Sequence, residues 1–248
     1  MTGGRTRRGD VADLAGSVGL GAWAGFGVLT MIVVGADGTP LAWDAAALSW
    51  SVGHRSAVAV ALARGLTATG TGVVAYGLVV LAGLLLGRTA RHRLAWAALA
   101  VGCLAAGQAV RFGLMTLVHR QRPAQADWRT AASGWSFPSG HTTTAALTAG
   151  LLVVALLLRA PRCRAPLVVV VACWGLLVGL TRVYLGVHWI SDVLGGWLLG
   201  VGWLGLCLCA AAWWLPDRLV AGATGRAPLP LEDRAPQDSA GGGRSRPA

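Results

Sequence analysis

Six long stretches of the chain contain no Asp, Glu, Lys or Arg, and they restrict its fold more than any other feature. They are residues 14–36, 65–87, 94–110, 130–158, 165–181 and 193–216. A helix needs about 20 apolar residues to cross about 30 Å of hydrocarbon. The third stretch reaches that length by extending past Arg111 to residue 118, the fifth extends past Arg182, and the fourth begins near Ser139. We therefore predict an all-α polytopic membrane protein with a six-helix transmembrane domain over 14–216.

Composition supports a membrane protein. The chain is 55% hydrophobic and 12% charged, whereas soluble domains carry about 25% charged residues. The first apolar stretch spans 23 residues (14–36), which exceeds the apolar core of about 7–15 residues in a secretory signal peptide. We therefore expect it to be a retained span.

The arginines predict the orientation in the membrane. All 21 basic residues are arginine, and 14 of them lie in four segments, 5–8, 88–93, 159–164 and 218–246. Six spans put these four segments on one side, which the positive-inside rule makes cytoplasmic. This distribution accounts for most of the net charge of +11 and argues against a nucleic-acid partner. We expect residues 1–13 to be a cytoplasmic segment and the Pro-, Gly- and Arg-rich residues 217–248 to be a disordered cytoplasmic tail.

Polar residues gather at the opposite, extracytoplasmic side. The sequence TRVYLGVHWISD (181–192) contains Asp192, which is the one carboxylate between Asp127 and Asp217. It also contains Arg182 and His188. Ionisable residues placed in an apolar region against their energetic cost indicate a functional site.

Three motifs lie at this side in the order MTLVHRQRP (115–123), PSGH (138–141) and TRVYLGVHWISD (181–192). Together they resemble the type 2 phosphatidic acid phosphatase and vanadium haloperoxidase superfamily, in its membrane lipid phosphate phosphatase branch. The pattern of that family is K-x6-RP, PSGH and SR-x5-H-x3-D. The second motif matches fully, and the third has Thr181 in place of serine. The first keeps Arg122 and Pro123 but has Met115 in place of lysine.

The chemistry of these residues favours the same reading. In a helix, His188 and Asp192 are neighbours four residues apart, so the carboxylate can orient the imidazole as a nucleophile. Arg122 and Arg182 offer guanidinium groups that suit phosphate oxygens. A buried His–Asp pair that only stabilises the bundle is the alternative interpretation.

The PSGH motif predicts an anion site at the start of the fourth span. Ser139 is a favourable N-cap, and Gly140 lets backbone N–H groups approach a phosphate at the helix N-terminus. We hypothesise that Arg122, Arg182, Ser139 and Gly140 bind the phosphoryl group while His188 attacks phosphorus. His141 then protonates the leaving oxygen and later activates water. Because the outer face offers few carboxylates, we expect no metal and no other cofactor.

Met115 removes a cation from the predicted site. Arg111, one turn earlier on the same helix face, and Arg120, nearer the loop, are the candidates to compensate. The role of Arg111 as a brace between helices stays open beside this one.

The resemblance implies a multi-pass cell-membrane enzyme that removes phosphate from a lipid phosphate at the extracytoplasmic face. Phosphatidic acid, phosphatidylglycerol phosphate and polyprenyl pyrophosphate all fit, and membrane lipids are the expected surroundings. The main alternative is a catalytically impaired, lipid-binding relative that lost activity with its lysine. Halide oxidation is disfavoured by the six spans and the lipid-facing site. Transport is disfavoured because the polar set lies at a membrane surface and not at the bilayer midplane. The arginine-, alanine- and glycine-rich composition indicates a bacterial source.

Overall fold

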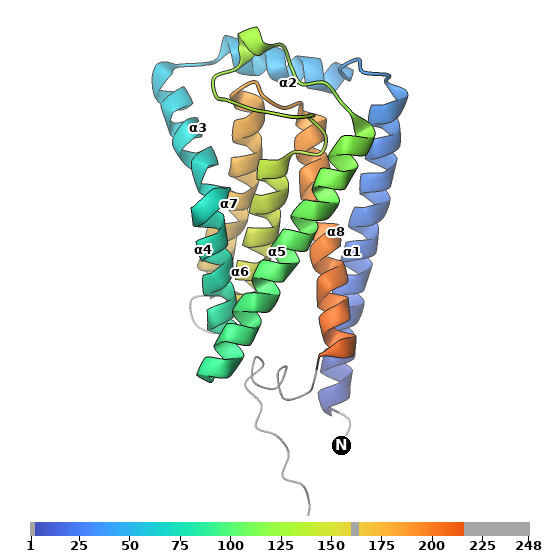
Figure 1. Ribbon diagram of the computed structural model, residues 1–248, viewed down its shortest axis with the longest axis vertical. Helices are drawn as coiled ribbons and strands as arrows, with labels where there is room; N and C mark the ends of the chain where they lie inside the picture. The colour runs from blue at the N-terminus through green and yellow to red at the C-terminus, as the bar shows by residue number, and fades with distance from the viewer. Residues whose placement is uncertain (1–2, 160–163, 216–248) are drawn as a thin grey trace, which may run out of the picture.

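The computed structural model describes residues 3–159 and 164–215, and side chains from residue 12 onward. The described residues form helices and loops without strands: α1 (Gly3–Gly35), α2 (Ala42–Gly53), α3 (Ala57–Thr69), α4 (Gly72–Leu86), α5 (Ala90–Val118), the 3-10 helix η1 (Gln125–Asp127), α6 (Gly140–Arg159), α7 (Arg164–Tyr184) and α8 (Ile190–Trp214). The long helices run side by side, and α2 lies across one end of the bundle (Figure 1). The predicted all-α class is confirmed; the tail prediction for 217–248 falls outside the described residues.

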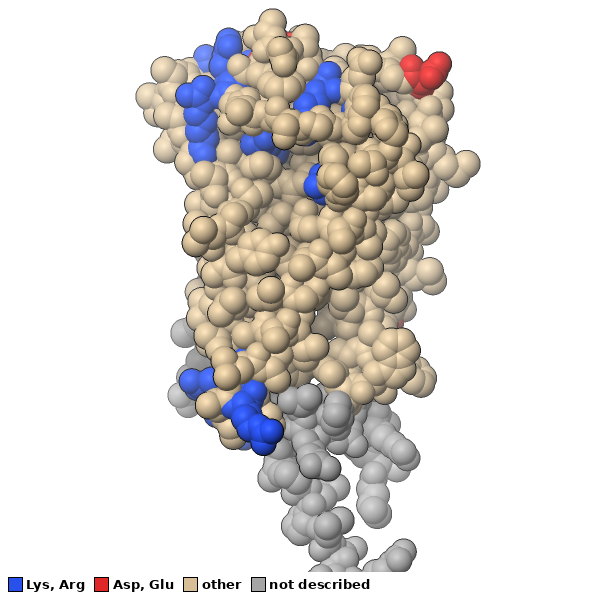
Figure 2. Space-filling model, viewed as in Figure 1, with Lys and Arg blue, Asp and Glu red and all other residues tan. Residues whose placement is uncertain are grey.

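Five of these helices, α1, α5, α6, α7 and α8, are long and apolar enough to cross a membrane. The α3–α4 pair, bent by 49°, passes the same test when the two helices are taken together, which gives up to six spans among the described residues. Large apolar side chains on the outer surface, such as Val73 (90% exposed), suit contact with lipid and not with water. Figure 2 agrees, because basic side chains gather toward the two ends of the visible face and leave an uncharged band between them.

The second span differs from the prediction of one helix over 65–87. It begins at Ala57 and breaks between Thr69 and Gly72. Gly72 has a φ of +59°, in the left-handed region that glycine adopts without a Cβ penalty. The sequence Gly-Thr-Gly at 70–72 therefore allows a backbone break that counting apolar residues does not detect.

Small residues let the helices approach closely around the site. α1 packs against α8, where a Cβ on Gly205 would lie 2.7 Å from the Cα of Gly19. α6 is central, since it packs against α4, α5, α7 and α8. Its N-terminus at Gly140 lies at the end of the bundle that α2 covers, together with the α5–α6 loop and the α7–α8 turn (Figure 1). All three predicted motifs meet at this end.

Helix α2 is an element that the sequence analysis did not predict. Its 12 residues are too few to span a bilayer, and long apolar runs were the criterion for expecting a helix. The side chain of Asp44, on this helix, is fully buried.

Candidate active site

The turn between α7 and α8 places His188 against Asp192. α7 ends at Tyr184 and α8 begins at Ile190, so His188 lies in the turn and Asp192 in the first turn of α8. His188 Nδ1 lies 3.3 Å from Asp192 Oδ2. The prediction that both side chains share one helix face is wrong, because only Asp192 is helical. It reaches back over the helix start and accepts a hydrogen bond from the Trp189 N–H at 2.8 Å, where unpaired backbone donors attract a carboxylate.

Arg122 faces the other nitrogen of the His188 ring, with its Nη1 atom 2.9 Å from Nε2. The same guanidinium group donates hydrogen bonds of 2.8 to 3.0 Å to the backbone carbonyls of Ser133, Gly134, Trp135 and Val187. Arg122 therefore joins the α5–α6 loop to the α7–α8 turn and holds both of them around His188.

These two contacts define the state of the imidazole. A carboxylate at Nδ1 and a guanidinium donor at Nε2 favour the neutral tautomer with its hydrogen on Nδ1. Burial lowers the pKa of His188 to about 4, although the neighbouring Asp192 opposes the shift. Nε2 is thus unprotonated at neutral pH and accepts a hydrogen bond from Arg122, and a nucleophilic imidazole requires an unprotonated nitrogen.

A cavity of about 330 Å³ opens in front of His188. It brings together side chains that are far apart in the sequence: Thr71, Gln108, Arg111, Arg122, Ala131, Ala132, Ser133, Gly140, His141, Thr144, Arg182 and His188. Three of these residues are arginines and two are histidines, and no Asp or Glu of the described segments lines the cavity. This electrostatic character suits a small anion.

Two of the lining arginines carry buried nitrogen atoms that have no hydrogen-bond partner among the described residues, namely the Nε atoms of Arg111 and Arg182. Arg182 is only 2% exposed and donates one hydrogen bond, from Nη1 to Thr67 Oγ1 at 3.2 Å. Arg111 Nη1 contacts the sulfur of Met115 at 3.2 Å. Buried guanidinium groups with so few acceptors are costly unless an anion completes their hydrogen bonds.

The PSGH motif contributes the wall at the start of α6. Gly140 is the first helical residue and His141 the second, and both line the cavity. A Cβ on Gly140 would lie 3.2 Å from Arg111 Nη1, so glycine allows this guanidinium group to approach the helix N-terminus. His141 Nε2 lies 3.5 Å from Thr71 Oγ1. Ser139 is fully buried and its hydroxyl accepts a hydrogen bond from Thr142, so its side chain does not line the cavity.

Arg120 also lies away from the cavity, behind His188. Its Nη1 donates to Asp192 Oδ1 and its Nη2 donates to Asp44 Oδ2, each at 2.6 Å. A second hydrogen bond from Nη1, also of 2.6 Å, goes to Ser191 Oγ. Arg120 is 5% exposed and its guanidinium group is held by these three partners. Of the two arginines considered as compensation for Met115, only Arg111 reaches the cavity.

Sequence reasoning missed several residues that support the site. Asp44 binds Arg120, Ser136 donates a short hydrogen bond to Asp192 Oδ2, and Thr67 binds Arg182. A signal for Asp44 was available, because it is the one carboxylate between Asp37 and Asp127. The isolation that drew attention to Asp192 applies equally to Asp44. Ser136 and Thr67 carry no comparable signal.

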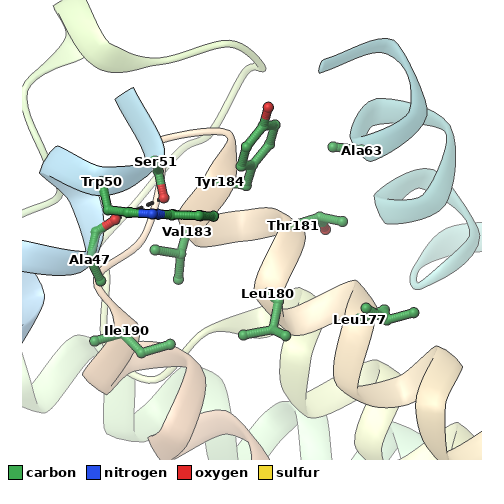
Figure 3. Close-up of a pocket in the computed structure, with 10 residues that line it drawn as sticks. All are labelled: Ala47, Trp50, Ser51, Ala63, Leu177, Leu180, Thr181, Val183, Tyr184 and Ile190. Carbon is green, nitrogen blue, oxygen red and sulfur yellow. Dashed lines mark hydrogen bonds between the residues drawn. The ribbon is translucent and has the colours of Figure 1, made fainter. Parts of the chain in front are cut away.

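A second cavity, of about 360 Å³, lies nearby and has an apolar lining (Figure 3). Its side chains come from α2, α3, α7 and α8: Ala47, Trp50, Ser51, Ala63, Leu177, Leu180, Thr181, Val183, Tyr184 and Ile190. It offers no charged group to a ligand, so the polar cavity is the candidate active site.

Comparison with known proteins bears on this site directly. Residues 96–216 match the model of the PAP2 superfamily. The chain carries a PAP2 superfamily domain. This domain covers nearly all of α5 and the whole of α6, α7 and α8, and therefore includes every site residue expected from the sequence. Asp44, Thr67 and Thr71 lie outside the matched segment and add to the site from α2, α3 and the α3–α4 break.

Relatives of the PAP2 domain are named as phosphatases. The chain is 39% identical over 72 residues to phosphatidylglycerophosphatase B of Bacillus subtilis, 46% over 66 residues to an undecaprenyl-diphosphatase of Sulfolobus acidocaldarius, and 44% over 71 residues to a lipid A 1-phosphatase of Rhizobium etli. These matches cover 28%, 27% and 29% of this chain and 36%, 29% and 27% of the respective relatives, so the chain spans about a third of their length.

The fold of this chain is also similar to that of a solved structure. A crystal structure of a transmembrane phosphatidylglycerolphosphate phosphatase of the PAP2 type from Bacillus subtilis superposes with a TM-score of 0.66 at 25% identity. The match covers 77% of this chain and 94% of that one. The arrangement therefore extends well beyond the segment that matches the family model.

Proposed function

We propose that this PAP2 protein is a membrane lipid phosphatase that removes phosphate from a lipid phosphate through a phosphohistidine intermediate. The observation that carries the proposal is the unprotonated Nε2 atom of His188, which faces a cavity lined by three arginines and is oriented from behind by Asp192. This is the arrangement that nucleophilic attack on a bound phosphoryl group requires.

The first half-reaction transfers the phosphoryl group to His188. Arg122 Nη1 gives up its hydrogen bond to His188 Nε2, and this freed N–H binds the phosphoryl oxygens together with the guanidinium group of Arg182 and the backbone N–H of Gly140. The Nε2 lone pair forms a bond to phosphorus, and the bond between phosphorus and the lipid oxygen breaks. The electron pair of that bond stays on the leaving oxygen, which takes a proton from His141; the bound phosphate dianion favours the protonated form of this imidazole. Asp192 stabilises the positive charge that develops on the imidazole.

The second half-reaction returns the enzyme to its starting state. His141, now neutral, accepts a proton from a water molecule, whose oxygen attacks phosphorus. The N–P bond breaks, its electron pair returns to Nε2 of His188, and inorganic phosphate leaves. All groups in this scheme belong to the chain, and the proposal assigns no role to a metal ion or a cofactor.

Arg111 completes the anion site in this proposal. Arg111, Arg122 and Arg182 line the cavity, while Arg120, Asp44 and Asp192 lie behind His188. Four arginines against two carboxylates leave a net charge of +2 when both histidines are neutral. A phosphate monoester carries about −2, so the substrate neutralises the site. Arg111 thereby supplies the cation that Met115 lacks, which argues against the catalytically impaired, lipid-binding alternative.

The names of the similar proteins support a lipid substrate. They concern phosphatidylglycerophosphate, undecaprenyl diphosphate and the 1-phosphate of lipid A. Phosphatidic acid, phosphatidylglycerol phosphate and polyprenyl pyrophosphate share a phosphate head at the membrane surface and an apolar tail. The N-terminus of α6, whose residues Gly140 and His141 line the cavity, lies at the end of the bundle opposite the α4–α5 turn (Figure 1). The arginines at 88–93, around that turn, favour the cytoplasm. The proposed site is therefore extracytoplasmic.

The test is phosphate release by purified protein from a panel of lipid phosphates and diphosphates in the presence of a chelator. We expect turnover of at least one of them, and none by His188→Ala. Normal turnover by His188→Ala overturns the mechanism. Binding of lipid phosphates without any turnover by the parent chain supports the lipid-binding alternative instead.

A further inference from the structure

Asp44 is the most deeply buried charged residue that the proposed mechanism does not use. It is 0% exposed and projects from α2, which lies across the end of the bundle (Figure 1). Its carboxylate accepts hydrogen bonds from Arg120 Nη2 at 2.6 Å and from Ser191 N at 2.9 Å. It also accepts the hydroxyl of Ser191, which lies 2.8 Å from each of its oxygens. A carboxylate with this many buried donors is held in place only while α2 is docked.

Arg120 connects Asp44 to the nucleophile. One edge of its guanidinium group binds Asp44 and the other binds Asp192. The opposite oxygen of Asp192 faces His188 Nδ1 at 3.3 Å. The chain Asp44–Arg120–Asp192–His188 therefore runs from α2 to the imidazole of the nucleophile through buried contacts alone.

The charges along this chain have a consequence for catalysis. One guanidinium group shared by two carboxylates leaves an excess negative charge beside His188, whereas a lone Arg120–Asp192 pair is neutral. Negative charge near the imidazole lowers the energy of the positively charged ring that forms during phosphoryl transfer. Asp44 thus acts against the neutralising effect of Arg120 on Asp192.

We propose that Asp44 is a positioning residue of the phosphatase reaction, which fixes Arg120 against Asp192 and preserves the negative charge that supports His188. The inference rests on the proposed function, since it takes His188 as the nucleophile. Docking of α2 is then a condition for full activity, although α2 contributes no side chain to the cavity.

Other charged and titratable groups also act on His188, and they are all present whether or not Asp44 is charged. Arg122 and Arg182 oppose its protonation, Asp192 favours it, and His141 lies near enough for mutual repulsion. They come from the α5–α6 loop, α7, α8 and α6. A change confined to Asp44 therefore isolates the contribution of α2.

The test is Asp44→Asn, which keeps the size and removes the charge, with Asp37→Asn as the matched control. Asp37 is an exposed carboxylate in the loop just before α2. We expect kcat of Asp44→Asn to fall about 10-fold, a typical cost for a partner that orients a reacting group from behind. KM and the inhibition constant of inorganic phosphate should stay within about twofold, because the cavity is unchanged. The acidic limb of kcat/KM should move to lower pH, since the imidazolium loses a stabilising charge. Asp37→Asn should match the parent chain.

A purely structural role for Asp44 gives a different pattern. Loosening of α2 would weaken phosphate inhibition together with kcat and leave the pH limb in place, and this result overturns the proposal. If Asp44→Asn yields no folded protein by thermal unfolding in detergent, Ser191→Ala removes the hydroxyl that Arg120 and Asp44 share. It should lower kcat in the same way by a smaller factor, and unchanged kcat in Ser191→Ala also overturns the proposal.

The outcome is separable from that of the proposed function. Activity in His188→Ala removes the assignment of the nucleophile. An inactive His188→Ala together with an Asp44→Asn variant that matches Asp37→Asn removes only the role of Asp44.

Discussion

Two cavities of similar size share helix α7, and their linings are opposite in character. The cavity in front of His188 has a volume of about 330 Å³ and contains Arg111, Arg122 and Arg182. The other has a volume of about 360 Å³ and is lined almost wholly by apolar side chains (Figure 3). Thr181 lines the second and its neighbour Arg182 lines the first. Cavity size therefore does not mark the active site in this membrane protein, and the buried unpartnered donors do.

The largest effect on activity should distinguish Arg182 from its neighbour Thr181. Arg182→Ala removes a guanidinium group aimed at the phosphoryl oxygens, and we expect kcat/KM to fall about 10²- to 10³-fold. Thr181→Val keeps the shape of its side chain, changes the wall of the apolar cavity and removes a hydrogen bond to the Val178 carbonyl, all outside the polar cavity, so phosphate release should remain near that of the parent chain. Equal losses of phosphate release in the two variants would mean that the polar cavity is not the site of the reaction.

A smaller effect should distinguish Arg111 from a brace between helices. Arg111→Gln removes one charge-assisted phosphate contact, and we expect a loss of about 10-fold in kcat/KM, mostly through KM. Met115 Sδ lies 3.2 Å from Arg111 Nη1, so a lysine at 115 can place its ammonium group near the lost guanidinium.

The double variant Arg111→Gln/Met115→Lys should therefore recover most of the activity, measured by the same assay of phosphate release. Arg111→Gln/Gln125→Lys is the control, since residue 125 is exposed in η1, on the loop that follows α5. Recovery in both double variants, or in neither, would count against a local role of Arg111 in binding phosphate.

The smallest effect concerns pH. Because burial lowers the pKa of His188 to about 4, about 90% of the nucleophile is still neutral at a pH one unit above that value. We expect the limb of kcat/KM that reports His188 to lie near pH 4 and not near 6.5, and Thr181→Val should show the same profile. Because the pKa of His188 in the folded protein lies below its ordinary value of about 6.5, His188 contributes to the stability of the fold at pH values above 6.5. This contribution is lost as the pH falls toward 4. A limb near 6.5 would show that His188 is not desolvated as the structure indicates.

The sequence allowed the spans and the centre of the site to be predicted for different reasons. Apolar runs report burial in lipid directly, so five spans and the all-α class followed from length alone. His188, Arg122 and Arg182 stood out because charge is costly in such runs. The bend at Gly70–Gly72 and the short helix α2 were not predicted, since neither changes the count of apolar residues.

The direction in which a side chain points was harder to predict than whether its residue lies near the site. Arg111 and Arg120 lie nine positions apart near one helix end, and nothing in their spacing shows which one faces the anion. The α5 helix ends at Val118, after which the loop turns Arg120 inward to Asp44 and Asp192. Arg111 stays on the helix and faces the cavity. The partner of Arg120 on α2 is 76 residues away along the chain, and such a long-range pairing is visible only once the fold is known.

The most direct test of the account is to trap the phosphorylated protein during turnover of a labelled lipid phosphate and to map the label. The account predicts an acid-labile, base-stable phosphohistidine at residue 188 that is absent from His188→Ala. Phosphate release at the parent rate from His188→Ala, or a label on a different residue, would contradict it.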